Sequence, residues 1–206
     1  MVGMMLSIWS CSTTRRIDEG ELLYCGVSNV NIVPDSGARL GDGVRSAVKE
    51  AVDVPPNNYW KLVGWHYPFP LGLWVYNNWP RAEKGFKHWI YEKLVEDPVL
   101  ISDVRPEVRT RMVEQILQNN GYFRGKAAYT MLPKKNPRKV SVAYDITTGP
   151  AFTLNTIEMP PDTSELAHKV DSIACKIPYL TPGSIYSADS LSMVRNVIAD
   201  GLRNKG

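Results

Sequence analysis

The chain has 206 residues, of which 44% are hydrophobic, 22% charged and 10% aromatic, and its formal net charge is +3. This composition is typical of an ordinary folded protein and excludes disordered, collagen-like and coiled-coil chains. The length allows one large domain or two small ones. A net charge of +3 is too small to indicate a nucleic-acid partner, and no apolar stretch is long enough for a membrane-spanning helix.

A short apolar run opens the chain and stops at a cysteine. Residues 4–10 are mostly apolar, Cys11 follows, and residues 12–16 are polar. An apolar run, a small residue and then cysteine are typical of a bacterial lipoprotein signal, in which Cys11 becomes the lipidated first residue. The run has no basic segment before it. The alternative is therefore a plain apolar N-terminus with an ordinary cysteine.

The next residues predict a strand and a helix. Apolar residues among Ser and Asn predict a strand over residues 24–33, which a Pro-Asp-Ser-Gly turn ends. Apolar residues at helical spacing predict a helix over residues 40–52, up to Pro55.

An aromatic-rich segment follows at about residues 56–101 and holds five of the six tryptophans. Residues 84–94 within it are predicted to be helical. Two interpretations stay open: the segment packs over its own domain, or it forms a docking surface for a partner or a lipid interface, where Trp and Tyr are favoured. The candidate docking residues are Trp60, Trp65, Trp74 and Trp79.

A helix and a β-hairpin complete the first half of the chain. Apolar residues every three or four positions predict a helix over residues 103–120, with Pro106 in its first turn and Gly121 as its left-handed stop. Alternating residues then predict a hairpin that turns at residues 133–137. Tyr122 and Phe123 are expected to anchor the helix to the sheet.

The same order of elements begins again after Gly149. Residues 152–157 are strand-like, and two helices are predicted, the second capped by Ser187. An offset of 85 residues superposes Gly121 on Gly206. The chain is therefore a repeated β-α-α unit. The first copy carries 41 more residues than the second, and the second has no hairpin, so we expect the chain to be a fragment.

The order strand, two helices and hairpin, joined through Gly121-Tyr122-Phe123, is similar to a POTRA domain, the polypeptide-transport-associated module. The lipoprotein-like start at Cys11 and the stretches 97–100 and 105–107 resemble the N-terminal region of Bacteroidetes outer-membrane proteins in the BamA/TamA superfamily. This resemblance implies an α+β fold of tandem POTRA-like β-α-α-β-β modules. It divides the chain into a signal remnant (1–10), a linker (11–23), a first POTRA-like domain (24–149) and an incomplete second one (150–206).

The resemblance also implies a function. POTRA domains of that family lie in the periplasm ahead of a C-terminal barrel, so we expect outer-membrane localisation on the periplasmic side. The expected partners are outer-membrane protein clients or subunits of the assembly machinery, together with the outer membrane through the lipid and a missing C-terminal barrel.

The strand at about residues 125–132 is expected to be a sheet edge, because the resemblance places it there. An edge offers unpaired N–H and C=O groups to an extended partner. We expect Lys126, Ala128 and Thr130 to form its outward row, with Ala127, Tyr129 and Met131 against the helices. Lysines around this strand either attract a partner or keep an exposed edge soluble.

Other functional classes have less support. The sequence has no G-x-S-x-G, H-E-x-x-H, P-loop or dinucleotide motif, and its three cysteines and three histidines are dispersed, so we expect no enzyme activity, metal or cofactor. The basic hairpin and the aromatic residues would suit single-stranded nucleic acid, but we expect none in the periplasm. The main alternative is a free-standing outer-membrane-anchored binding or scaffold lipoprotein that uses the aromatic segment.

Overall fold

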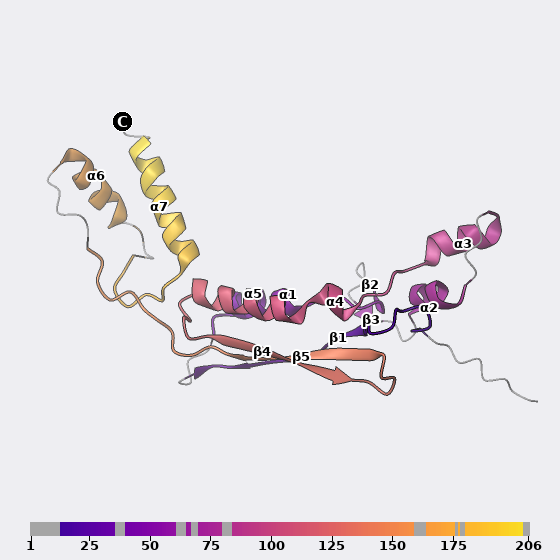
Figure 1. Ribbon diagram of the computed structural model, residues 1–206. Coiled ribbons are helices and arrows are strands. Elements are labelled where there is room, and N and C mark those ends of the chain that lie inside the picture. The colour runs from indigo at the N-terminus through magenta and orange to yellow at the C-terminus, as the bar shows by residue number, and fades with distance from the viewer. Residues whose placement is uncertain are drawn as a thin grey trace, which may run out of the picture. The chain divides into compact units, whose positions relative to one another are not determined.

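A computed structural model describes residues 13–35, 40–60, 65–66, 70–79, 84–158, 164–175, 177 and 180–203 (Figure 1). The fold is α+β, as predicted. The elements, in chain order, are β1 (Leu23–Val33), α1 (Asp42–Val52), β2 (Tyr59–Trp60), β3 (Trp65–His66), α2 (Leu71–Asn78), α3 (Phe86–Leu94), α4 (Ile101–Val104), α5 (Pro106–Asn119), β4 (Lys126–Pro133), β5 (Lys139–Thr147), α6 (Glu165–Ala174) and α7 (Ala188–Arg203).

The chain forms two compact units, each built from three stretches. The first contains residues 1–29, 53–106 and 129–143, and the second contains residues 30–52, 107–128 and 144–206. Strands β1, β4 and β5 contribute residues to both units. The predicted division of the chain at residue 150 stays a prediction.

The three-stranded sheet has the order β1-β5-β4. The Leu23 N–H donates to the Arg138 carbonyl at one end of the β1/β5 pair, and the Thr148 N–H donates to the Val33 carbonyl at the other. Residue numbers rise along both strands from the first of these bonds to the second, so β1 and β5 are parallel. The strand order makes β5 the central strand of the sheet and β4 an edge strand.

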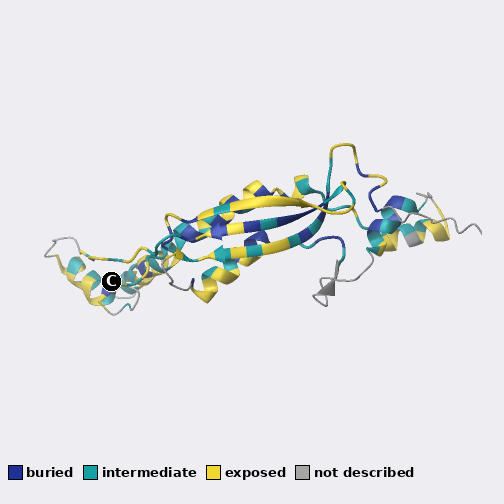
Figure 2. Ribbon diagram, turned by 90° about the horizontal axis from the view of Figure 1, so that it is seen from below, coloured by how far each residue is buried: buried dark blue, intermediate teal, exposed yellow. Residues whose placement is uncertain are grey.

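The core of the second unit lies between the helices and one face of the sheet. Strand β5 alternates buried and exposed residues towards its end, where Tyr144 and Ile146 are fully buried (Figure 2). Helices α1 and α5 cover this face in Figure 1. Each of them has a fully buried valine, Val48 in α1 and Val113 in α5. The predicted period-two and period-3.6 patterns therefore correspond to a sheet covered by two helices.

The aromatic-rich segment belongs to the first unit. Strands β2 and β3 form a two-residue antiparallel ladder, and α2 buries Leu73 and Val75. Leu73 packs with Ile17 and Leu23, and the half-buried Leu100 lies against this cluster. The segment is therefore attached to the start of β1 by an apolar core of its own. None of the helices in the described residues has both the length and the apolar composition to cross a membrane.

The helix predicted over residues 103–120 is present as α5 (Pro106–Asn119), but it begins three residues later than predicted, because Arg105 separates it from the short helix α4. Arg105 has a left-handed backbone with φ +49°. The helical conformation is disfavoured before a proline, and Pro106 also lacks the N–H that would continue α4. Pro106 is instead the first residue of α5, which is the place predicted for it.

The strand predicted over residues 152–157 is wrong. Only Thr153 forms a β-bridge there, with Ile185. The Leu154 N–H donates to the Ser184 carbonyl, and the Tyr186 N–H donates to the Phe152 carbonyl. This stretch pairs with the turn before α7 rather than with a sheet. The predicted helices are present as α6 and α7, and Ser187 accepts a hydrogen bond from the Ser190 N–H as a cap does.

Candidate functional site: an open strand edge

Strand β4 is an edge strand, as predicted. It spans Lys126–Pro133, and β5 is its only strand neighbour in the part of the chain that the structure describes. Seven of its eight residues are exposed. The strand therefore has one side bonded to β5 and one side turned to solvent.

The hairpin register decides which backbone groups face outwards. The Lys134 N–H donates to the Lys139 carbonyl over 3.0 Å, and the Thr147 hydroxyl donates to the Lys126 carbonyl over 3.5 Å. Alternate residues of an antiparallel strand bond to the same neighbour. Even-numbered residues of β4 are thus paired with β5, and the N–H and C=O groups of Ala127, Tyr129 and Met131 point away from it.

At both ends of β4 the outward backbone has no free N–H to offer to another strand. The Ala127 N–H donates to the Glu114 carboxylate of α5 over 3.2 Å, and Lys126 Nζ lies 3.9 Å from the same oxygen. At the other end Pro133 has no N–H to donate. The outward N–H groups of Tyr129 and Met131 lie between these two ends.

The side chains of β4 differ in part from the predicted arrangement. Lys126, Ala128 and Thr130 are exposed. Tyr129 and Met131 were predicted to lie against the helices, but they are 37% and 46% exposed. The helix layer covers the central strand more completely than the edge, so these two side chains add apolar surface beside the open backbone.

Arg138, one of the basic residues around the hairpin, is a structural residue. Its guanidinium donates to the Thr14 carbonyl and the Asp18 carbonyl, each over 2.9 Å, and also to the Ile17 carbonyl. Residues 13–18, which were predicted to be a linker, are held by these bonds. Lys134 and Lys135 at the same turn are exposed.

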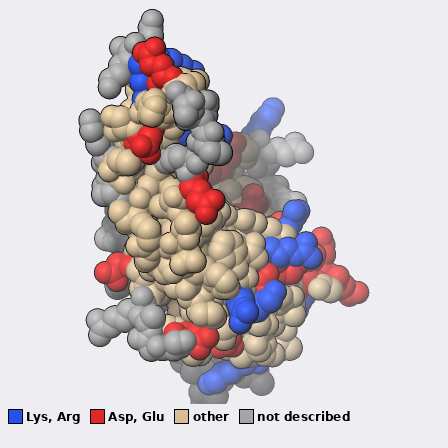
Figure 3. Space-filling model, turned by 90° about the vertical axis from the view of Figure 1, so that its left-hand side faces the viewer, with Lys and Arg blue, Asp and Glu red and all other residues tan. Residues whose placement is uncertain are grey.

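On the face shown in Figure 3, basic and acidic side chains are interspersed around a broad uncharged surface.

The first strand, at the other edge of the sheet, is covered where it begins. The Tyr24 N–H donates to the Val99 carbonyl, and the Ile101 N–H donates to the Leu22 carbonyl. Asn57 holds this covering stretch, because its amide donates to Asp97 O over 2.7 Å and accepts from the Val99 N–H over 2.8 Å. Extended pairing at this place on β1 is thus already occupied by the chain itself.

The predicted junction of Gly121, Tyr122 and Phe123 is well defined. Gly121 has φ +84°, and the Tyr122 N–H donates to the Leu117 carbonyl over 2.9 Å. Tyr122 is buried, as an anchor between helix and sheet should be. Phe123 is 45% exposed and instead packs its ring against Phe152 and Tyr186, with centroids 5.3 and 5.0 Å away.

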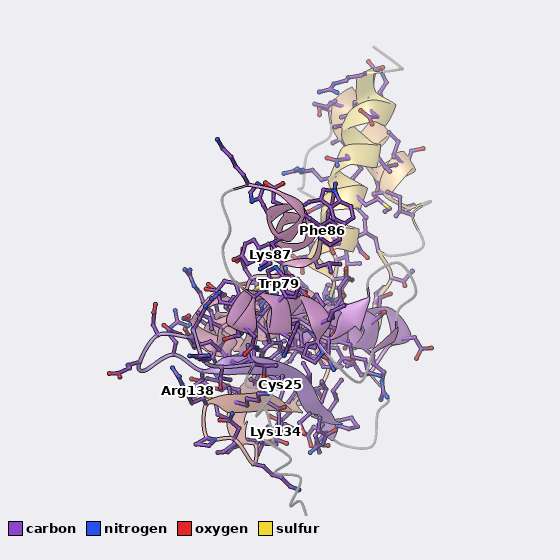
Figure 4. The ribbon with its side chains drawn as sticks, turned by 90° about the vertical axis from the view of Figure 1, so that its right-hand side faces the viewer. Cys25, Trp79, Phe86, Lys87, Lys134 and Arg138 are labelled. Carbon is purple, nitrogen blue, oxygen red and sulfur yellow. The ribbon has the colours of Figure 1, made fainter. Side chains whose placement is uncertain are left out.

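The four candidate docking tryptophans are not an exposed group. Trp74 and Trp79 are half-buried and pack edge to face, with ring centroids 6.5 Å apart. Trp79 Nε1 donates to the Lys87 carbonyl over 3.2 Å, which ties α2 to α3 (Figure 4). The backbones of Trp60 and Trp65 pair with each other, and their side chains lie outside the described residues.

Among the aromatic side chains of this segment that the structure describes, Phe86 and Trp89 of α3 are the exposed ones. They are 74% and 56% exposed, and their rings stack with centroids 6.0 Å apart. Sequence reasoning did not single them out as a docking pair. Their spacing of three residues within the predicted helix was the available signal, since such residues share one helix face.

A pocket of about 210 Å³ lies in the first unit beside Cys25. Pro56, Asn57, Leu73 and Lys139 are among its lining residues. Burial raises the pKa of the Cys25 thiol, although the nearby Lys139 acts in the opposite direction. A thiol with a raised pKa stays protonated near neutral pH, so Cys25 is a poor nucleophile. Cys11 lies outside the described residues.

No family model matches the chain, and no curated protein matches it. Among solved structures, the crystal structure of Haemophilus influenzae BamA POTRA3-5 is similar with a TM-score of 0.36 and 12% sequence identity. The match covers 89% of this chain and 56% of the BamA fragment, so this chain spans just over half the length of that fragment.

Proposed function

We propose that the chain is the periplasmic POTRA region of an outer-membrane protein assembly or translocation factor. It binds extended segments of client proteins, or of other assembly subunits, by adding them as a strand to β4. A lipid on Cys11 attaches the chain to the periplasmic side of the outer membrane. The role needs no catalytic group, metal or cofactor.

The observation that carries this proposal is the open edge of β4. Its outward N–H and C=O groups match the hydrogen-bonding pattern of any extended peptide, whatever the peptide's sequence. Main-chain bonding suits a factor that must accept many different clients. The exposed side chains of Tyr129 and Met131 offer apolar contacts to alternate residues of the added strand.

Hydrogen exchange followed by NMR tests this proposal at single amides. The probe is a synthetic peptide of alternating aromatic and acidic residues, because Lys134 and Lys135 are exposed beside the edge. Saturating peptide should slow exchange of the Tyr129 and Met131 amides by roughly tenfold or more. The Thr130 amide should change little, because it is already bonded to β5.

A proline substitution separates the contribution of the β4 backbone to peptide binding from that of its side chains. Met131→Pro removes an outward N–H but no bond to β5, and an edge strand tolerates proline at such a position. We expect peptide affinity to fall about tenfold, because the loss of one hydrogen bond between the strands costs about 1.4 kcal/mol. Met131→Ala keeps the N–H and should bind within about threefold of the parent. Equal affinity of the proline variant, or protection of β1 in place of β4, would contradict the proposal.

A further inference from the structure

The α3 patch consists of the stacked rings of Phe86 and Trp89 together with the exposed lysines of residues 84–94, which are Lys84, Lys87 and Lys93. We propose that the α3 patch docks on the surface of a phospholipid bilayer that contains anionic headgroups. This inference goes beyond strand addition at β4 and takes only its cellular setting from the proposed function.

The two aromatic side chains of the patch are largely exposed to solvent. Phe86 is 74% exposed and Trp89 is 56% exposed, although both are large enough to be core residues. Figure 4 shows Phe86 on α3. Exposed aromatic rings can enter the boundary between headgroups and acyl chains, where Trp and Phe of surface-binding helices lie.

The charges around the rings are those that attract a membrane. All three lysines are exposed, and Lys93 follows Phe86 by seven residues and so lies on the same helix face. The acidic residue of α3, Glu92, lies 3.3 Å from His88 Nε2. Residues 84–94 therefore combine three lysines and one glutamate with two exposed aromatic rings, a composition found in helices that bind anionic lipid surfaces.

The start of the described chain is fixed close to this patch. The Asn77 side-chain amide of α2 donates to the Thr13 carbonyl over 2.9 Å, and its oxygen accepts from the Arg16 N–H over 2.8 Å. The Arg16 guanidinium donates to the Tyr76 carbonyl and to the Trp79 carbonyl. Residue 13 is thus held on α2.

This attachment determines which surface a membrane anchor would bring to the bilayer. Cys11 precedes Thr13 by two residues, and two residues of extended chain span only about 7 Å. Trp79 connects α2 to α3 through its bond to the Lys87 carbonyl. A lipid on Cys11 would hold α2 and α3 next to the bilayer, so the aromatic rings and the anchor act on the same surface.

Co-sedimentation with vesicles tests the proposal on the full chain carrying Cys11→Ala, so that no lipid contributes. The vesicles are equimolar phosphatidylethanolamine and phosphatidylglycerol, with pure phosphatidylcholine vesicles as the comparison. We expect binding to the anionic vesicles that weakens with salt. The double variant Phe86→Ser/Trp89→Ser should reduce the partition coefficient by roughly tenfold or more. It should fold normally, because both side chains are exposed.

A matched control and a spectroscopic readout complete the test. Leu166→Ser/Met193→Ser removes two side chains that are 58% and 57% exposed on α6 and α7, and it should leave vesicle binding unchanged. Trp89→Phe should retain binding but lose most of the vesicle-induced blue shift of tryptophan fluorescence.

Each opposite outcome overturns the membrane assignment. These outcomes are equal loss in both double variants, binding that does not distinguish the two lipid compositions, and no vesicle binding at all. A patch that binds a protein partner instead would give the last result. Since the peptide assay at β4 uses no vesicles, the failure of one proposal leaves the other testable.

Discussion

At the residue scale, Gly121 joins α5 to the hairpin of β4 and β5. Its backbone is left-handed, a conformation that is strained in residues with a side chain. The Gly121 N–H donates to the Gln118 carbonyl and the Tyr122 N–H donates to the Leu117 carbonyl, which is the bonding of a Schellman cap. A Cβ on Gly121 would lie 2.8 Å from the Tyr186 carbonyl oxygen. The position therefore requires glycine both for its left-handed φ and for the close approach of another segment.

Gly121→Val should lower the free energy of unfolding by about 2 kcal/mol or more, since left-handed strain and the clash with Tyr186 act together. For a chain of this size the melting temperature should fall by about 4–8 °C. Gly183→Val is the matched control: its φ is +88°, but its Cβ would meet nothing within 4 Å. The melting temperature of the Gly121 variant should be the lower of the two. Equal values would show that the close approach to Tyr186 contributes nothing.

At the element scale, β4 shows how an exposed edge is limited in length. Glu114 of α5 accepts from the Ala127 N–H at one end, and Pro133 offers no donor at the other. A long open edge is a site for uncontrolled pairing between chains, and charged or proline residues at its ends reduce that risk. The unpaired backbone of β4 is thus limited to the short stretch between Ala127 and Pro133.

Glu114→Ala should free the Ala127 amide and speed its hydrogen exchange by roughly tenfold, because its acceptor is removed. Glu114→Gln keeps an oxygen that can accept the bond and should change exchange by a smaller factor. Exchange of the Thr130 amide, which bonds to β5, serves as the internal reference. An unchanged rate at Ala127 in the alanine variant would mean that Glu114 does not close the edge.

The sequence predicted elements that depend on local patterns and missed features that depend on distant contacts. Alternation in β5 and the spacing of α5 are local signals, and both elements were found close to their predicted places. The role of Arg138 was not predictable, because its acceptors in residues 14–18 lie about 120 positions away. The exposure of Tyr129 and Met131 likewise depends on how far the helix layer extends over the sheet.

At the scale of the whole molecule, the N-terminal residues 13–18 are an integral part of the first unit. Arg138 binds their carbonyl groups, Asn77 binds Thr13 and Arg16, and Ile17 is buried beside Leu73. Cys11 thus precedes by only two residues a stretch that is bonded to the first unit.

Arg138→Ala should release residues 13–18, because several charge-assisted hydrogen bonds are lost together. Trypsin cleavage after Arg15 and Arg16 under native conditions should accelerate by roughly tenfold, as expected for local opening that is easier by about 1.4 kcal/mol. Lys135→Ala changes an exposed residue of the same turn and should cleave at the parental rate. The idea fails if both variants are cleaved equally fast.

The parallel pairing of β1 with β5 has a consequence for the way the chain acquires its structure. Leu23 of the first strand meets Arg138, about 115 positions later, and β4 depends on the same central strand. The sheet cannot form until β5 has been synthesised, and contacts between such distant positions make folding slow. The two edge strands, β1 and β4, thus have no strand partner until the central strand is made, which is the last of the three along the chain.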